Sequence, residues 1–320
     1  MFRQHFMAGH FPLCLLLVCA GVACAQGYPN KSIRMVTAEA GGGNDLVARV
    51  IAQGLTSGLG QQVIVDNRGG SGVIPIEIVA KAPADGYTLL VFGSALWLLP
   101  YIQNVSYDPL RDIAPIAIGA VTPLVVVVHP TLPVKSIKEL IAMAKARPGQ
   151  LNYASGISGS VTHLPAELFK AMAGVNIVRV TYKGGAPALN AILGGEVQVM
   201  FAAAATAVSH VNSGRLRGLA ATTAQPSTLF PGLPTVAEDL PGYESVAITG
   251  LYAPPRTPVS LINRMNNEII KVLNRAEIKE RFKNSGFEVV VTTPDQFTAT
   301  IKAEMARMGK VIKDAGIRAE

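Results

Sequence analysis

Cysteine is almost absent from this 320-residue chain, and the three that occur, Cys14, Cys19 and Cys24, all precede residue 26. Beyond that point no side chain can form a disulfide, act as a thiol nucleophile or supply a thiolate to a metal. A domain of this length without cross-links must be held together by the burial of apolar side chains. Its 49% of hydrophobic residues are sufficient for that.

The first 25 residues have the features of a secretory signal peptide. Arg3 supplies a positive charge, residues 11–23 form an apolar run, and Ala23-Cys24-Ala25 offers small residues for cleavage before Gln26. The run is shorter than the about 20 apolar residues that a membrane-spanning helix needs. We therefore expect export of the mature chain. A lipid anchor on Cys24 is an alternative that the sequence leaves open.

Concentrated charge is also lacking. The formal net charge is +7, only 15% of the residues are charged, and the Lys and Arg residues are dispersed without an accompanying ladder of aromatic side chains. Nucleic-acid binding is therefore a poor interpretation. Dispersed positive charge favours at most a mild attraction for anionic solutes.

Catalytic and metal-binding sets are scarce as well. After residue 25, histidine occurs only as His129, His163 and His210, and the chain has no Gly-x-x-x-x-Gly-Lys-Ser/Thr loop for nucleotides. Residues 155–160 approach the nucleophile turn of serine hydrolases, but Ser160 stands where that pattern requires its last glycine. We expect neither an enzyme nor a cofactor or metal, and keep an exported hydrolase using Ser158 as the rival hypothesis.

What the chain has in abundance is an alternation of short apolar strands with amphipathic helices. This alternation is typical of an α/β protein with a parallel sheet covered by helices on both faces. The three last helices are expected at 258–275, 276–285 and 294–315. Strands are expected at 33–37, 62–66, 87–92, 124–129, 151–154, 177–182, 197–201, 216–221 and 246–252.

Two of these strands are apolar enough to cross between domains, 124–129 and 216–222. They predict two lobes, one interrupted by the other, with a ligand cleft between them. On this hypothesis lobe I is discontinuous and comprises residues 26–124 and 226–320, whereas lobe II comprises 125–225.

Glycine-rich turns open directly onto a helix at three places. We name them the first cradle (41–45), the second cradle (158–163) and the third cradle (183–186). A helix N-terminus leaves backbone N–H groups unpaired and carries about half a positive charge. Glycine lets a ligand approach that backbone closely, so each turn is a candidate anion site. Three cradles without a catalytic set predict binding of a small anion rather than its conversion.

Short motifs spread over residues 28–316 have an order and spacing that point to one family. They include Tyr28-Pro29-Asn30-Lys31, Asp66-Asn67-Arg68-Gly69-Gly70, Asp85-Gly86-Tyr87-Thr88-Leu89, Pro148-Gly149-Gln150-Leu151, Tyr182-Lys183-Gly184-Gly185-Ala186-Pro187, Leu233-Pro234-Thr235-Val236 and Ala253-Pro254-Pro255-Arg256. In these motifs the chain resembles the substrate-binding receptors of tripartite tricarboxylate transporters, also called the Bordetella uptake gene (Bug) family.

The resemblance implies a type II periplasmic-binding-protein fold, whose two lobes close on a small organic anion such as a carboxylate or an acidic amino acid. It also implies a periplasmic location and delivery of this solute to integral membrane transporter subunits. We expect a monomer that binds no nucleic acid. A ligand-dependent partner of a membrane sensor is the alternative. The chain departs from the family pattern at 37–40, which includes Glu39, at Ala202 and at Ile248. These departures predict a pocket adapted to a less charged or more apolar carboxylate.

The predicted ligand-binding residues come from both lobes. Ser94 and the turn at 70–72 follow strands of a predicted parallel sheet, at the edge where ligands enter such sheets. Asp45 could instead complement the helix dipole, and His163 could be a packed or capping histidine. The full set is Gly41, Gly42, Gly43, Asp45, Gly70, Ser71, Ser94, Ser158, Gly159, Ser160, His163, Lys183, Gly184, Gly185 and Ala202.

Overall fold

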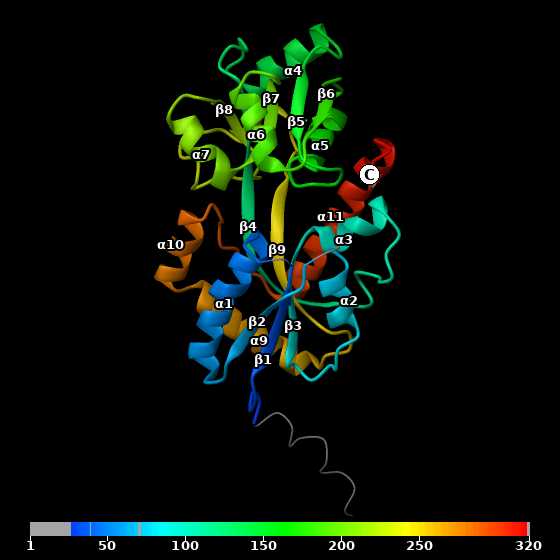
Figure 1. Ribbon diagram of the computed structural model, residues 1–320, viewed down its shortest axis with the longest axis vertical. Coiled ribbons are helices and arrows are strands. Elements are labelled where there is room, and N and C mark those ends of the chain that lie inside the picture. Colours follow the sequence, from blue (N-terminus) through cyan, green and yellow to red (C-terminus); the bar gives the residue numbers. More distant parts are fainter. Residues whose placement is uncertain (1–26, 39, 70–71, 319–320) are drawn as a thin grey trace, which may run out of the picture.

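The computed structural model describes residues 27–38, 40–69 and 72–318. The predicted signal peptide, Glu39, Gly70 and Ser71 lie outside these ranges. The described residues form two α/β lobes, stacked one above the other in Figure 1 and joined by the strands β4 (Ala114–Val128) and β9 (Val246–Ala253). None of the helices within those ranges has both the length and the apolar character required to span a bilayer.

The lower lobe in Figure 1, lobe I, is built on three parallel strands in the order β2 (Val63–Asn67), β1 (Ile33–Thr37), β3 (Thr88–Gly93). Strand β9 pairs antiparallel with β3, and residues 114–123 of β4 pair antiparallel with β9. The helices of this lobe are α1 (Gly43–Leu59), α2 (Ile74–Ala80), α3 (Ala95–Ile102), α9 (Val259–Leu273), α10 (Ala276–Asn284) and α11 (Pro294–Asp314).

The upper lobe, lobe II, repeats this plan. Strand β5 (Asn152–Ser155) pairs parallel with β6 (Val178–Thr181) and with β7 (Val199–Ala203). Residues 124–128 of β4 then pair antiparallel with both β7 and β8 (Arg217–Ala221). The helices on this side are α4 (Ile137–Ala146), α5 (Leu164–Ala173), α6 (Gly185–Leu193) and α7 (Ala204–Asn212), and the short helix α8 (Val236–Asp239) precedes β9.

The sheet differs from the prediction in being mixed rather than parallel. The two strands that join the lobes pair antiparallel with each other, and their pairings with β3, β7 and β8 are antiparallel as well. Strand β4 also begins ten residues before the predicted 124–129, at Ala114. The apolar run is interrupted there by Pro115, Gly119 and Pro123, so the sequence does not predict a strand. Proline cannot donate a hydrogen bond to a neighbouring strand, and glycine weakens a strand.

Helix α9 packs its apolar face against the core of lobe I, as its sequence predicts. Ile262, Met265, Ile269 and Leu273 are all buried. A Cβ added to Gly54 of α1 would clash with a methyl group of Val272 on α9, so the two helices approach closely. Close helix packing on one side of a sheet is what makes a lobe a rigid body on which loops can be positioned.

Residues 226–245 were predicted to belong to lobe I, and that boundary stays a prediction. Phe230 shares an apolar cluster with Val125 and Ala188, and the Tyr243 hydroxyl donates to the carbonyl of Pro165 at 3.0 Å. The N–H of Ser245 donates to the carbonyl of Thr222 at 2.8 Å. On these contacts we propose that the chain returns to lobe I along β9.

Candidate functional site

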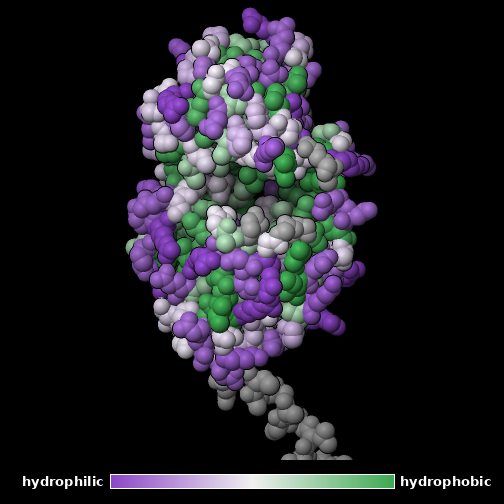
Figure 2. Space-filling view, in the orientation of Figure 1, coloured by the Kyte–Doolittle hydropathy of each residue, from purple (hydrophilic) through white to green (hydrophobic). Residues whose placement is uncertain are grey.

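The predicted cradles lie where the two lobes face each other. In Figure 1 helix α1 begins at the level where the lobes meet, and the loop that leads into α5 lies at the lower rim of lobe II. Figure 2 shows the surface hollowed between the lobes, with apolar side chains around the hollow. That the cradles of both lobes border this hollow stays a prediction.

In the first cradle, Asp45 closes the turn on itself. Its carboxylate accepts the backbone N–H of Gly41 at 2.9 Å, Nε of Arg49 at 3.0 Å and Nδ2 of Asn67 at 2.8 Å. Burial alone would raise the pKa of this carboxyl, but the hydrogen bonds from Arg49, Gly41 and Asn67 outweigh it, and the pKa is lowered. Asp45 thus has the contacts of a residue that shapes the turn, and its contact with ligand stays a prediction.

The rest of the first cradle is connected to lobe II through two residues that follow α10. A Cβ added to Gly43 would lie 3.4 Å from the ring of Phe287, and one added to Gly286 would lie 2.5 Å from Cβ of Ala205 on α7. Gly42 caps α1 without a side-chain hydrogen bond. The first turn of α1 is therefore held next to the end of β7.

Ser94 lies beside the first cradle, at the end of β3. Its hydroxyl accepts the N–H of Ile248 at 3.0 Å and is 3.3 Å from the carbonyl of the same residue. Asn44 of the first cradle has its Oδ1 3.4 Å from the hydroxyl of Thr249. Asn44 and Ser94 thus flank the position of Ile248, one of the departures from the family pattern.

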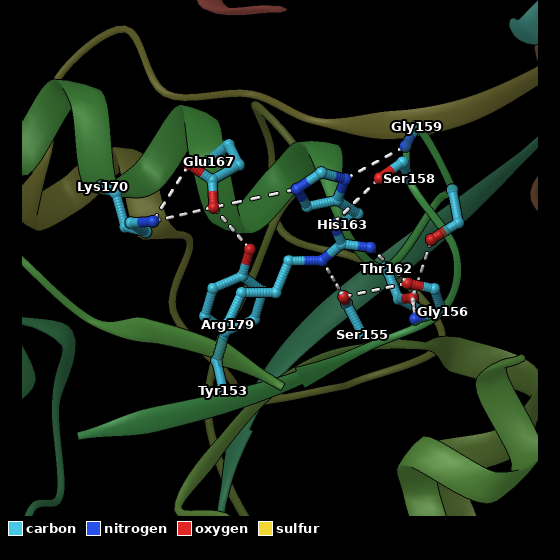
Figure 3. Close-up of polar contacts among 11 residues, drawn as sticks. Tyr153, Ser155, Gly156, Ser158, Gly159, Thr162, His163, Glu167, Lys170 and Arg179 are labelled. Atoms are coloured by element: carbon cyan, nitrogen blue, oxygen red, sulfur yellow. Dashed lines mark hydrogen bonds and ion pairs between the residues drawn. The ribbon is translucent and has the colours of Figure 1, made fainter. Parts of the chain in front are cut away.

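The second cradle is organised by Arg179 of β6, drawn in Figure 3. Its Nε donates to Oγ of Ser155 at 2.8 Å, and its two terminal nitrogens donate to Oγ of Ser158 at 3.0 Å and to the carbonyl of Gly156 at 2.8 Å. Sequence reasoning missed this residue. The signal available was a positive charge inside an otherwise apolar strand.

Short-range contacts hold the remainder of that loop. The N–H of Gly156 donates to Oγ1 of Thr162 at 2.8 Å, and the hydroxyls of Thr162 and Ser160 are 3.3 Å apart. The N–H of Gly159 donates to Nδ1 of the buried His163 at 3.0 Å. His163 therefore supports the loop from beneath, whereas the serines border its surface.

A buried carboxylate lies behind the second cradle. Glu167 of α5 accepts the hydroxyl of Tyr153 at 2.5 Å and Nζ of Lys170 at 2.8 Å, and its Oε1 is 3.8 Å from Nε2 of His163 (Figure 3). Burial and the charge of Glu167 raise the pKa of Tyr153 far above its usual range. The phenol consequently stays a hydrogen-bond donor that holds the carboxylate.

The third cradle lies beside the second, because Thr181 pairs with Ser155 in the parallel strands β6 and β5. It is built differently. Helix α6 begins without a side-chain cap, Lys183 is exposed, and a Cβ added to Gly184 or Gly185 would have no atom within 4 Å. This turn presents open backbone next to a cationic side chain.

Not all predicted site residues come together. Ala202 is fully buried in the apolar cluster that includes Val125 and Ala188. Gly70 and Ser71 lie outside the described residues. Within the described ranges, no group of three His, Cys, Asp or Glu side chains is placed to hold a metal ion.

Comparisons with known proteins agree with the two-lobed fold. The family model described as "Tripartite tricarboxylate transporter family receptor" (TctC) matches residues 47–317. Protein BugT of Bordetella pertussis is 36% identical over 313 residues, which cover 95% of this chain and 96% of BugT.

Two solved structures share the whole fold. R. palustris Rpa4515 with adipate has a TM-score of 0.73 and 36% identity, and the match covers 91% of this chain and 99% of that protein. The periplasmic binding protein BugD has a TM-score of 0.71 and 30% identity, with coverage of 91% and 100%. The protein therefore has the two-lobed periplasmic-binding-protein fold and is a solute receptor rather than an enzyme. It belongs to the TctC family of tripartite tricarboxylate transporter receptors, together with the Bug proteins.

Proposed function

We propose that this chain is an exported, periplasmic receptor that binds a small organic anion of the carboxylate class between its lobes. It would deliver that solute to integral membrane subunits of a tripartite transporter. The observation that carries the ligand class is the pair of helix N-termini opening side by side from β5 and β6, with Lys183 exposed next to them. Helix N-termini stabilise anions, and an ammonium group adds a counter-charge.

The contacts between lobes support binding by closure. The position of a Cβ on Gly159 in the second cradle is 2.5 Å from Cδ1 of Ile102 on α3, so this loop touches lobe I. A second contact between the lobes involves Gly286, which follows α10 of lobe I. A Cβ added there would lie 2.5 Å from Cβ of Ala205 on α7 of lobe II. A ligand held between the cradles would contact both lobes, and such a ligand shifts the equilibrium toward the closed form by its differential affinity.

Strand β4 supplies an axis for this closure. Its partners change from β9 to β7 and β8 at Pro123 and Leu124. Proline cannot donate to the ladder, and Thr222 takes over there, accepting the N–H of Leu124 at 3.1 Å. We propose that the lobes rotate about this point. The residues of β4 before it pair with β9, and the residues after it, up to Val128, pair within lobe II.

The choice of carboxylate follows from charge. The charge of Asp45 is balanced by that of Arg49, and its carboxylate also accepts from two uncharged donors, so Asp45 adds no unpaired negative charge to the cradles. A dicarboxylate with an apolar middle, like the adipate bound to Rpa4515, fits an anion site bordered by Ile102.

The experiment is a thermal and calorimetric titration of the refolded protein with straight-chain dicarboxylates, monocarboxylates, and acidic and neutral amino acids. Prior unfolding removes any ligand that was carried through purification. At a hundred times Kd, a ligand stabilises the native state by about 2.7 kcal/mol. We expect this stabilisation from dicarboxylates and not from neutral amino acids.

The variant that sharpens the test is Lys183→Ala. Removing the counter-charge should weaken dicarboxylate binding about tenfold, with a smaller dependence on salt, and leave the melting temperature of the free protein unchanged. Lys145→Ala, an exposed lysine in the last turn of α4, is the matched control and should change neither. A cooperatively unfolding protein that none of these anions stabilises would contradict the proposed function.

A further inference from the structure

The three residues Gly286-Phe287-Glu288, which follow α10, form a short strap that contacts both lobes. A Cβ added to Gly286 would clash with Ala205 on α7 of lobe II. The ring of Phe287 lies against the first cradle, 3.4 Å from the position of a Cβ on Gly43. The strap therefore touches the predicted ligand site of lobe I with its middle residue and lobe II with its first.

The backbone of Glu288 is bonded to the strand that joins the lobes. Its N–H donates to the carbonyl of Val121 at 2.8 Å, and its carbonyl accepts the N–H of Val121 at 2.9 Å. Further along the same segment, the hydroxyl of Thr292 accepts the N–H of Ile118 at 3.0 Å. Both contacts are made before Pro123, where β4 changes partners. The backbone of Glu288 is therefore attached on the lobe I side of the proposed axis.

The side chain of Glu288 crosses that axis. Its Oε1 accepts three hydrogen bonds, from Oγ of Ser227 at 2.8 Å, from the N–H of Thr228 at 2.9 Å and from Oγ1 of Thr228 at 3.0 Å. Ser227 is buried, and the nearby Phe230 shares an apolar cluster with Val125 of lobe II. Hydrogen bonds to a carboxylate are about twice as strong as those between neutral groups, so this contact between the two sides is a firm one.

Rotation of the lobes about Pro123 and Leu124 would strain these three bonds. The backbone of Glu288 moves with the first part of β4, whereas Ser227 and Thr228 move with lobe II. Hydrogen bonds weaken once the donor and acceptor are more than about 3.2 Å apart, so a small displacement of this loop is enough to break them. The three bonds therefore favour one arrangement of the lobes over the rotated ones.

We propose that Glu288 is a latch across the hinge, which holds the two lobes in the arrangement of Figure 1 before the ligand arrives. The inference rests on the proposed function in so far as the ligand binds between the lobes. A receptor whose binding arrangement is only partly populated loses affinity in proportion to that fraction. The latch therefore raises the affinity without touching the ligand, and Glu288 is a positioning residue.

The first measurement needs no ligand. In the protein that begins at Gln26 no native cysteine is present, so two introduced cysteines can carry spin labels. Lys81→Cys labels lobe I and Lys145→Cys labels lobe II, both at exposed positions. Pulsed electron paramagnetic resonance then measures the distance between the labels. We expect one main distance when Glu288 is present, and a second, predominant distance in Glu288→Ala.

Two further variants separate the latch from general effects on the fold. Thr228→Val removes one of the three bonds at an exposed side chain, and it should populate the second distance less than Glu288→Ala does. Glu139→Ala is the matched control. Its Oε2 accepts the N–H of Lys135 at 2.6 Å within lobe II, so its loss should leave the distance unchanged.

Ligand kinetics provide a measurement that a residue of the ligand site would change differently. With a dicarboxylate that stabilises the native protein, Glu288→Ala should bind about tenfold more weakly, through slower association at an unchanged dissociation rate. A residue that contacts the ligand would instead raise the dissociation rate. Faster dissociation at an unaltered distance between the labels would assign Glu288 to the ligand site and overturn the latch.

The latch and the proposed function fail separately. An unaltered distance in a well-folded Glu288→Ala would overturn the latch, whichever ligands bind. The second distance appearing equally in Glu139→Ala would also overturn it, because the lobes would then respond to the loss of any carboxylate. A second distance confined to Glu288→Ala and Thr228→Val would support the latch even if no carboxylate bound, a result that contradicts the proposed function alone.

Discussion

The second and third cradles begin at neighbouring strands of one lobe, yet they are constructed in opposite ways. The second is held by Arg179, Thr162 and His163. The backbone N–H groups of its Gly159, Ser160 and His163 are already bonded within the loop. The third has an extended glycine, Gly184 with φ of 171°, and an uncapped helix start. One is a rigid wall, whereas the other offers its donors to the solvent.

This difference assigns separate tasks to the two turns. A fixed loop costs little to keep in its bound conformation, because its freedom was lost on folding. An open helix N-terminus retains the hydrogen-bonding capacity that an anion needs. We interpret the second cradle as the part that sets the shape of the cleft, and the third as the part that binds the charge.

The largest effect on stability and on ligand affinity is expected from removing the hydrogen bonds by which Arg179 holds the second cradle. Arg179→Ala deletes three hydrogen bonds from a charged donor, each worth about 1.5–3 kcal/mol and not additive. We expect a loss of about 3 kcal/mol in the free energy of unfolding and of about a hundredfold in dicarboxylate affinity. Urea denaturation and calorimetry measure both.

Arg34→Ala provides the matched control, since Arg34 is also a strand arginine of this sheet and its Nε donates to Asp66 at 2.7 Å. This pair is partly exposed, so its loss should cost about 1 kcal/mol or less. Ligand affinity should not change. Equal losses of affinity in the two variants would show that Arg179 acts through general stability and would break the distinction between the cradles.

A pair of glycine substitutions gives the next largest contrast. Gly159 has φ of +77°, and its added Cβ would meet Ile102 at 2.5 Å, whereas Gly184 is extended and open. Gly159→Ala should therefore cost about 2 kcal/mol of stability, from left-handed strain and from the clash between lobes. Gly184→Ala should leave the melting temperature unchanged but weaken ligand binding, because the new methyl group hinders approach to the backbone.

Measuring both glycine variants by thermal denaturation and by titration with the same dicarboxylate separates the two effects. A stability loss in Gly184→Ala as large as that in Gly159→Ala would contradict the open geometry of the third cradle. Unchanged binding in Gly184→Ala would instead remove this turn from the ligand site.

Much of the fold was readable from the sequence because its signals are local. Helix α9 was predicted from the spacing of Ile262, Met265, Ile269 and Leu273, and these side chains do form core. The first half of β4 was not predicted, since Pro115 and Pro123 break the pattern and only pairing with β9 stabilises it. Helix α3 was also missed, because it is apolar nearly all round and contains Pro100.

For the candidate site, too, only the features with a local signal could be predicted from the sequence. Glycine before a helix marks a turn by itself, so the cradles could be located without a fold. The contribution of Arg179 depends on the register that places it beside Tyr153, and the role of Glu167 depends on the packing of α5. Contacts between distant segments have no local pattern, so the sequence contained no direct sign of them.

The smallest expected effect extends the comparison to the first cradle. Asp45 holds the first cradle by accepting hydrogen bonds at its carboxylate, whereas Arg179 holds the second cradle by donating hydrogen bonds from its guanidinium group. Asp45→Asn keeps the shape but removes the charge that accepts from Gly41 and Arg49. We expect a loss of about 1 kcal/mol at neutral pH.

The pH dependence of this loss tests its cause. The pKa of Asp45 is lower in the folded protein than its ordinary value of 3.8. Its charge therefore stabilises the fold above that value, and the contribution disappears as the pH falls through the lowered pKa. The difference in unfolding free energy between the native protein and Asp45→Asn should consequently be largest at pH 6–7 and shrink below about pH 4. Asp314→Asn, which removes an exposed partner of Lys310, should show a smaller difference at every pH. A difference for Asp45→Asn that stays constant from pH 7 to pH 3 would show that the turn depends on the shape of this side chain and not on its charge.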